Sequence, residues 1–189
     1  MGKLGMLHRQ YAIAPINLLI AGVFGLTALA VVTAGLVLPL PGIEIVTDPR
    51  EIFTTLGAGL TGPVGGVIIG ILAGINEPGG IRWASILAHV AGGLWMGFSY
   101  RMLVHDRLQM PWRILGWAGL VLVYYYLVVA PGFVIGINLF YPETREPGVS
   151  AIGQYLTLAR GVAPEALLTL LVTSLVLAAL PRRRQRPLW

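Results

Sequence analysis

The sequence of 189 residues contains no cysteine and little charge. Without cysteine the chain has no disulfide bonds, no thiolate metal ligands and no cysteine nucleophile. Only 11% of its residues are Asp, Glu, Lys or Arg, whereas soluble domains carry about 25%. Nucleotide-binding loops, zinc-protease motifs and hydrolase nucleophile motifs are also missing from the sequence. We therefore expect neither an enzyme nor a bound metal or cofactor.

Long apolar runs take the place of the missing charge. Hydrophobic residues make up 56% of the chain, and the mean hydropathy is +0.79. Five runs are long enough to cross about 30 Å of hydrocarbon, and they cover residues 14–38, 52–76, 83–104, 113–141 and 162–180. The first run is too long for the apolar core of a signal peptide. The sequence predicts an all-α, multi-pass protein of a cell membrane, with one domain over residues 1–189.

The positions of the basic residues predict which segments face the cytoplasm. Lys3 and Arg9 lie in the segment 1–12, three arginines lie in the loop 101–113, and four lie in the tail 181–189. The positive-inside rule places these three segments on the cytoplasmic side. The loops 39–51 and 142–161 hold several acidic residues and are predicted to be external. The basic clusters lack interleaved aromatic residues, so we expect no nucleic-acid partner.

Five crossings would put the two termini on opposite sides, which contradicts this charge pattern. Gly62-Pro63 interrupts the second run at its middle, and this dipeptide disfavours a continuous helix. We therefore expect two short helices, 49–61 and 63–77, joined at an elbow. The prediction becomes about six transmembrane helices with both termini cytoplasmic. Because each arm reaches only about 20 Å, a re-entrant hairpin remains an alternative to two full spans.

Small residues in this region predict close helix packing. In a bilayer, glycine lets two helices approach within backbone contact. The glycines expected at the elbow and in the packed faces are Gly59, Gly62, Gly66, Gly70, Gly74 and Gly93.

The stretch 48–103 resembles the substrate-binding S components of energy-coupling factor transporters. The resemblance rests on Asp48-Pro49-Arg50, on the sequence GLTGPVGG at 59–66, and on the glycines that follow it. It implies a prokaryotic cytoplasmic membrane and a vitamin-like solute bound from outside. It also implies two kinds of partner, a coupling transmembrane subunit and separate ATPase subunits. Four small residues of the first helix are candidates for docking on that coupling subunit: Ala21, Gly25, Ala30 and Ala34.

The same stretch is similar to the membrane receptor domain of LytS-type sensor kinases, which has a comparable Gly-Pro elbow. That similarity implies a ligand sensor acting through a partner, and we expect it to stand alone without a kinase part. A third alternative is a structural or assembly subunit of a membrane complex, in which the glycines serve only helix packing.

Polar residues within or beside the apolar runs are the candidates for solute binding. His89 lies deep in the run 83–104, and Tyr124 and Tyr125 lie in the middle of the run 113–141. A neutral, hydrogen-bonded histidine and plain aromatic packing are the alternatives for these three residues.

Other candidates lie where the runs leave the membrane. Asn76 and Glu77 are expected to line an external cavity with Arg82, or else Glu77 pairs locally with Arg82. Asn138 and Glu143 are expected in a polar lid, or else in a solvated rim. The remaining members of that lid are Glu44, Asp48, Arg50, Tyr141 and Arg145.

Overall fold

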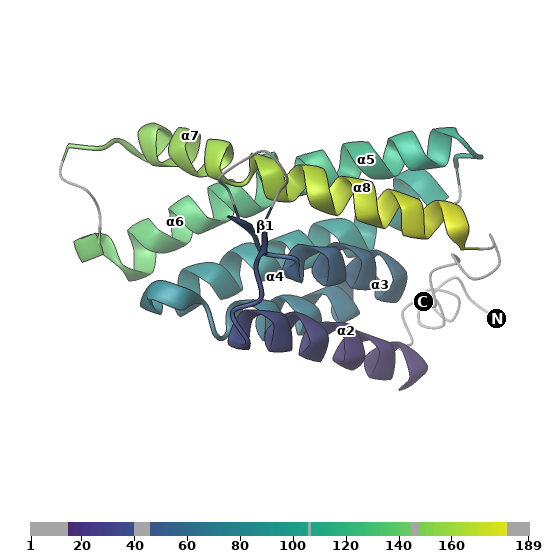
Figure 1. Cartoon of the computed structure of the whole chain (residues 1–189), viewed down its shortest axis with the longest axis horizontal. Coiled ribbons are helices and arrows are strands. Elements are labelled where there is room, and N and C mark those ends of the chain that lie inside the picture. Colours follow the sequence, from purple (N-terminus) through teal and green to yellow (C-terminus); the bar gives the residue numbers. More distant parts are fainter. Residues whose placement is uncertain (1–14, 40–45, 106, 145–147, 181–189) are drawn as a thin grey trace, which may run out of the picture.

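The computed structural model describes residues 15–39, 46–105, 107–144 and 148–180. These residues form a bundle of helices with one short antiparallel strand pair, in which Leu38 lies opposite Thr47 (Figure 1). The segments 1–12 and 181–189, together with Glu44 and Arg145, lie outside the described residues. In chain order the elements are α2 (Pro15–Thr33), β1 (Leu38–Pro39), β2 (Val46–Thr47), α3 (Arg50–Gly74), η1 (Pro78–Gly80), α4 (Arg82–Ser99), η2 (Tyr100–His105), α5 (Trp112–Val123), η3 (Tyr124–Val129), α6 (Ala130–Phe140), η4 (Pro142–Thr144), α7 (Ala151–Gly161) and α8 (Ala163–Ala179).

Among the described residues, three helical segments are long and apolar enough to cross a membrane: 15–33, 50–74 and 112–140. The bent pair α7 and α8, with an angle of 47° between them, makes a fourth if it is counted as one span. The described part of the chain is therefore a helical bundle with the character of a membrane protein, as the sequence predicts. The helix α7 was not predicted, because its residues were assigned to the external loop 142–161. Ser150 caps this helix by accepting a hydrogen bond from the Gly153 backbone N–H at 3.1 Å.

The predicted elbow is confirmed within α3. Gly62 has φ 82° and ψ −174°, a backbone conformation that breaks the helix between two arms and that glycine adopts without a steric penalty. A hydrogen bond of 3.1 Å from the Arg50 guanidinium to the Ala73 carbonyl shows that the chain doubles back there. In a straight helix these two residues would lie about 35 Å apart.

The second arm of α3 runs antiparallel to α4, and glycines line their contact. A methyl group on Gly66 would lie 2.2 Å from the Gly93 carbonyl oxygen, and one on Gly93 would lie 2.1 Å from the Gly66 carbonyl oxygen. The same register continues in both directions, with Gly70 against the backbone of His89 and Gly97 against that of Gly62. This glycine seam brings the two backbones together, as the sequence predicts for Gly62, Gly66, Gly70, Gly74 and Gly93. The remaining glycine of the predicted set, Gly59, packs against the Trp117 ring of α5.

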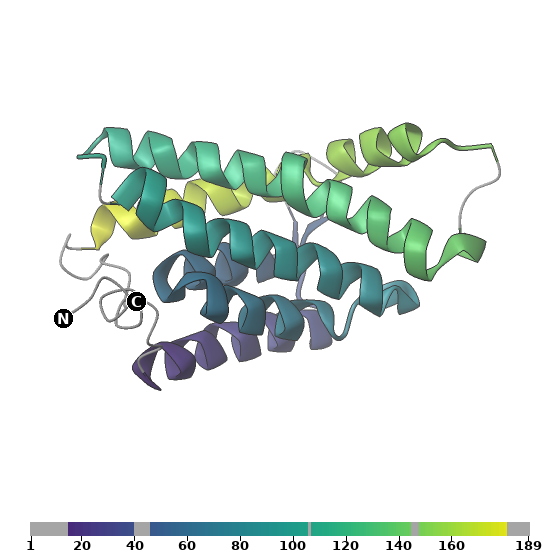
Figure 2. The same cartoon turned by 180° about the vertical axis from the view of Figure 1, so that it is seen from behind.

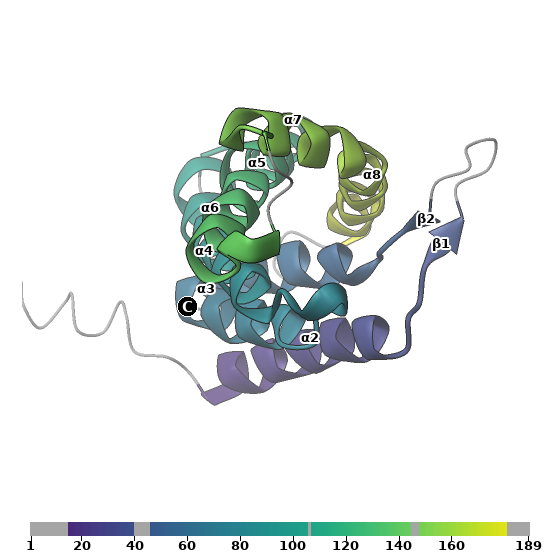
Figure 3. The same cartoon turned by 90° about the vertical axis from the view of Figure 1, so that its left-hand side faces the viewer.

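The remaining helices surround this pair. α2 packs on α3, α4 packs on α6, and α5 packs on α8. Figures 1 and 2 show from two sides that the start of α2, the connection from η2 to α5, and the end of α8 share one end of the bundle. Seen along the long axis, β1 and β2 extend from the side of the bundle next to α3 and α8 (Figure 3).

Two of the four predicted docking residues, Ala21 and Gly25, lie in the contact between α2 and α3. Ala21 is fully buried and Gly25 is packed against Leu72 and Ile69 of α3. Both residues therefore serve the contact between α2 and α3 and are not available to another subunit. The other pair, Ala30 and Ala34, is exposed.

Candidate functional site

A network of charged and polar side chains lies inside the bundle where the open ends of the α3 hairpin meet α4. Its centre is Glu51, whose exposed fraction is 2%. One carboxylate oxygen of Glu51 lies 2.6 Å from Nε2 of His89. The other oxygen accepts hydrogen bonds from the Thr54 hydroxyl at 2.8 Å and from the Tyr124 hydroxyl. Three helices thus converge on one carboxylate.

The backbone fixes where the proton of the His89 ring lies. Nδ1 of His89 is 2.7 Å from the Ser85 carbonyl oxygen and 3.1 Å from the Ser85 hydroxyl. Because a carbonyl oxygen only accepts, Nδ1 carries a hydrogen and donates it. A single proton then lies between Nε2 and the Glu51 carboxylate, so the pair is either imidazolium with carboxylate or imidazole with carboxylic acid. Both forms keep the pair neutral overall, which suits a buried position.

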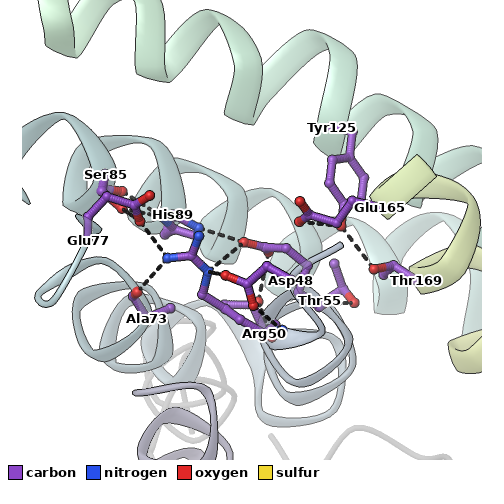
Figure 4. A network of polar contacts seen from close by, with 12 residues as sticks. Asp48, Arg50, Thr55, Ala73, Glu77, Ser85, His89, Tyr125, Glu165 and Thr169 are labelled. Atoms are coloured by element: carbon purple, nitrogen blue, oxygen red, sulfur yellow. Dashed lines mark hydrogen bonds and ion pairs between the residues drawn. The ribbon is translucent and has the colours of Figure 1, made fainter. Parts of the chain in front are cut away.

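Arg50 joins this pair to the end of the bundle. Its guanidinium contacts Glu77 at 2.6 Å, Asp48 at 3.1 Å and Glu51 at 3.6 Å. The Ser85 hydroxyl donates to the same Glu77 oxygen at 2.9 Å. Figure 4 shows Arg50 between Asp48 and Glu77, with Ser85 and His89 beyond them. The network therefore runs without interruption from Glu77 to Glu51.

Asp48 holds Arg50 in place from the loop before α3. One of its oxygens accepts the Arg50 backbone N–H at 2.8 Å, and the other contacts the Arg50 guanidinium. Burial raises the pKa of Asp48 above its ordinary value, and the positive charge of Arg50 opposes this rise. The sequence Asp48-Pro49-Arg50 thus has a structural role, because it begins α3 and orients the guanidinium towards Glu77.

A second polar group adjoins the first on the side of α8. The Tyr125 hydroxyl donates to Glu165 at 3.1 Å and lies 2.9 Å from the Thr169 hydroxyl (Figure 4). One helical turn further along α8, Thr173 accepts a hydrogen bond from the Trp117 ring at 2.8 Å. Tyr125 is packed edge to face against Tyr124, with ring centroids 5.2 Å apart, so the two groups are in contact.

Two consecutive tyrosines in the π-helical segment η3 are both buried. Tyr124 and Tyr125 are 0% and 1% exposed, and they bond to α3 and α8 respectively. A π-helical turn is uncommon and is frequent at functional sites. Neither tyrosine ring borders one of the two pockets described below. Both hydroxyls are engaged, so the two tyrosines position the charged network.

One pocket opens beside Glu77. Its volume is about 250 Å³, and its lining comes from the loop between α3 and α4 and from the end of α6. Asn76, Glu77 and Arg82 all border this pocket. The predicted alternative, a local pair of Glu77 with Arg82, is wrong, because Glu77 pairs with Arg50. The complete lining is Ile75, Asn76, Glu77, Gly80, Arg82, Trp83 and Tyr141.

The members of the predicted lid that the structure describes do not come together. Asn138 donates to the Gln154 side chain at 3.0 Å, beside a second pocket of about 280 Å³ between α6 and α7. Glu143 is exposed, Tyr141 borders the first pocket, and Asp48 belongs to the charged network.

Glu51 and Glu165 were missed at the sequence level. Each begins a polar stripe with a spacing of about one helical turn on an otherwise apolar helix. The stripes are Glu51, Thr54 and Thr55 on α3 and Glu165, Thr169 and Thr173 on α8. Such stripes are a detectable signal of a buried polar site.

Comparison of the chain with protein-family models, with curated proteins and with solved structures gives no match.

Proposed function

We propose that the chain is a membrane-embedded solute-binding protein whose solute enters the pocket beside Glu77. One observation carries the proposal: a paired charge network lies between apolar helices and reaches an open pocket through Glu77. Charged side chains inside a membrane are costly, and where they occur they usually serve a ligand, an ion or a proton. Glu51 and His89 already pair with each other inside the bundle, whereas Glu77 borders the pocket. A solute that enters the pocket therefore contacts Glu77 first.

The pocket favours a small, flat, polar solute. Trp83 and Tyr141 offer aromatic surface for stacking. Glu77, Arg82 and Asn76 offer a carboxylate, a cation and an amide at the same opening. A vitamin-like heterocycle with both hydrogen-bond donors and acceptors matches this set. Tyr124 and Tyr125 act behind the pocket, by holding Glu51 and Glu165.

The proposed topology has six helical passes with both termini cytoplasmic. The passes are α2, the two arms of α3, α4 with η2, the helix from α5 to α6, and the pair α7 and α8. In support, the three helix ends that adjoin the basic segments of the sequence share one end of the bundle (Figures 1 and 2). The α3 arms, with about 12 residues each, reach only about 18 Å, so they form a hairpin sheltered by α2 and α4.

Within this proposal the chain serves as the S component of an energy-coupling factor importer. The resemblance of residues 48–103 motivates this assignment, and the α3 elbow with its glycine seam is consistent with it. A coupling transmembrane subunit and ATPase subunits then drive release of the solute. The exposed Ala30 and Ala34 remain candidates for contact with a partner.

The decisive experiment is mass spectrometry of small molecules retained by the purified full chain. We expect one small solute to be retained, and Glu77→Gln to reduce its retention about tenfold, because a charged hydrogen-bond partner is lost. Glu143→Gln is the matched control, since Glu143 is exposed and outside the network. A chain that retains no solute, or equal retention by Glu77→Gln and the wild type, would reject the proposed site.

A further inference from the structure

A second feature, far from the charged network, involves the buried cation Arg113. Arg113 lies in the first turn of α5, and its exposed fraction is 3%. Its Nε and Nη1 atoms have no hydrogen-bond partner, and no carboxylate of the described residues forms an ion pair with it. An unpaired buried charge is among the most destabilising features that a protein can contain. Arg113 therefore requires an anion that the described part of the chain does not supply.

The Tyr100 hydroxyl points to the same missing group. Tyr100 is fully buried, and its hydroxyl also has no hydrogen-bond partner. Arg113 lies one helical turn before Trp117 on α5, and the Trp117 ring contacts Tyr100, so both groups belong to the contact between η2 and α5. The Tyr100 ring is held edge to face against Trp117, with centroids 5.0 Å apart. A guanidinium and a rigid hydroxyl that are both without partners at one helix contact can together donate several hydrogen bonds to an oxyanion.

The position of this pair separates it from the solute site. Tyr100 follows His89 by about three helical turns on the continuous helix of α4 and η2, which is about 16 Å. Tyr100 begins η2 and Arg113 lies in the first turn of α5, and the connection from η2 to α5 lies at one end of the bundle (Figures 1 and 2). This is the loop that the sequence predicts to face the cytoplasm.

We propose that Tyr100 and Arg113 form a binding site for a phosphate-type oxyanion, carried by an anionic lipid headgroup or present as free phosphate. The surroundings favour the lipid. Met102, Trp112 and Leu115 lie within two residues of Tyr100 or Arg113 in the sequence, and they are 60%, 64% and 59% exposed, so acyl chains have apolar surface to cover. A buried arginine at the level of the headgroups pairs well with a lipid phosphate. This site does not depend on the solute-binding proposal.

Native mass spectrometry of the full chain tests the site. The delipidated protein is titrated with phosphatidylglycerol, with phosphatidylcholine, or with inorganic phosphate alone. We expect one phosphatidylglycerol to bind the wild type at least about tenfold more tightly than it binds Arg113→Gln, because a charge-assisted pair is lost. Arg107→Gln is the matched control, since Arg107 belongs to the same loop and is exposed, and it should bind like the wild type.

Tyr100→Phe keeps the test decisive if Arg113→Gln does not fold. It removes only the hydroxyl, and we expect it to weaken phosphatidylglycerol binding by about threefold to tenfold. Binding of inorganic phosphate that depends on both residues would assign the site to the free ion instead of the headgroup. Equal phosphatidylglycerol and phosphate binding by the wild type, Arg113→Gln and Tyr100→Phe would overturn the proposal. An effect of Arg107→Gln as large as that of Arg113→Gln would also overturn it, because it would reflect charge of the loop in general.

Discussion

Replacing Gly66 by alanine tests whether the α3 elbow and the glycine seam determine this fold. The added methyl group would lie 2.2 Å from the Gly93 carbonyl oxygen and 2.5 Å from its carbon. Both atoms belong to a helix backbone and cannot rotate away. To restore an ordinary contact of 3.4 Å, the second arm of α3 and α4 must separate by about 1.2 Å.

The expected cost follows from this separation. Overpacking in a rigid interior costs about 1–3 kcal/mol, and the wider seam also loses dispersion contacts at the neighbouring glycine positions. We expect Gly66→Ala to destabilise the protein by about 2 kcal/mol or more, which lowers the unfolding midpoint by about 4–8 °C for a chain of this size. The assay is thermal unfolding of the purified protein in one detergent, followed by intrinsic tryptophan fluorescence.

Gly22→Ala is the matched control. Gly22 lies in α2, and a methyl group there would meet nothing within 4 Å. This variant should unfold at the wild-type midpoint or slightly above it, because alanine is the better helix former. If Gly66→Ala and Gly22→Ala unfold at the same temperature, the seam is not in backbone contact and the described packing of α3 on α4 is wrong.

Three further predictions concern the network and the topology. Glu51→Gln should lower the free energy of unfolding by less than about 1 kcal/mol, since an amide can still bond to the neighbouring imidazole. Glu51→Ala should lower it by about 3 kcal/mol or more. Equal losses for the two variants in thermal unfolding would contradict the paired arrangement. Tyr125→Phe should lower the free energy of unfolding by about 1–2 kcal/mol because Glu165 loses its hydrogen-bond donor. An unchanged thermal unfolding midpoint would show that this hydrogen bond contributes nothing to stability. The chain has no native cysteine, so single cysteines introduced in place of Gly80 and Gln109 can be labelled with an impermeant maleimide. The cysteine at position 80 should react only from outside, and the cysteine at position 109 only from inside. Labelling of both from one side would reject the six-pass topology.

The sequence was most informative where one residue type has a single physical explanation. Gly62-Pro63 predicted the elbow, because proline and glycine together disfavour a continuous helix at that point. The spacing of four residues between Gly62, Gly66, Gly70 and Gly74 predicted a packed face, and this face lies against α4. His89 stood out as an ionisable residue within an apolar run, and it lies in the network.

The sequence was less informative where the position of a side chain depends on the doubling back of the chain. Glu51 directly follows Asp48-Pro49-Arg50 and resembles part of a polar loop, yet the hairpin places it beside His89 of α4 and Tyr124. Arg50 and Glu77 are 27 residues apart and meet only because the arms are antiparallel. Ala21 and Gly25 have the spacing of a docking motif, but the same spacing also serves packing within the chain. Local patterns cannot distinguish these two uses.

The seam and the charged network depend on each other. Helices in a membrane gain little from the hydrophobic effect and associate through close packing and hydrogen bonds. The seam supplies the close packing along the second arm of α3, and the network begins where the seam ends, because Gly74 packs against Ile86 next to Ser85. At that end the first arm brings Arg50 and Glu51 within reach of Glu77 and α4. The elbow therefore folds the two arms of α3 against each other, and the charged end of this hairpin is surrounded by protein. Charged side chains within a membrane persist when protein, and not lipid, surrounds them.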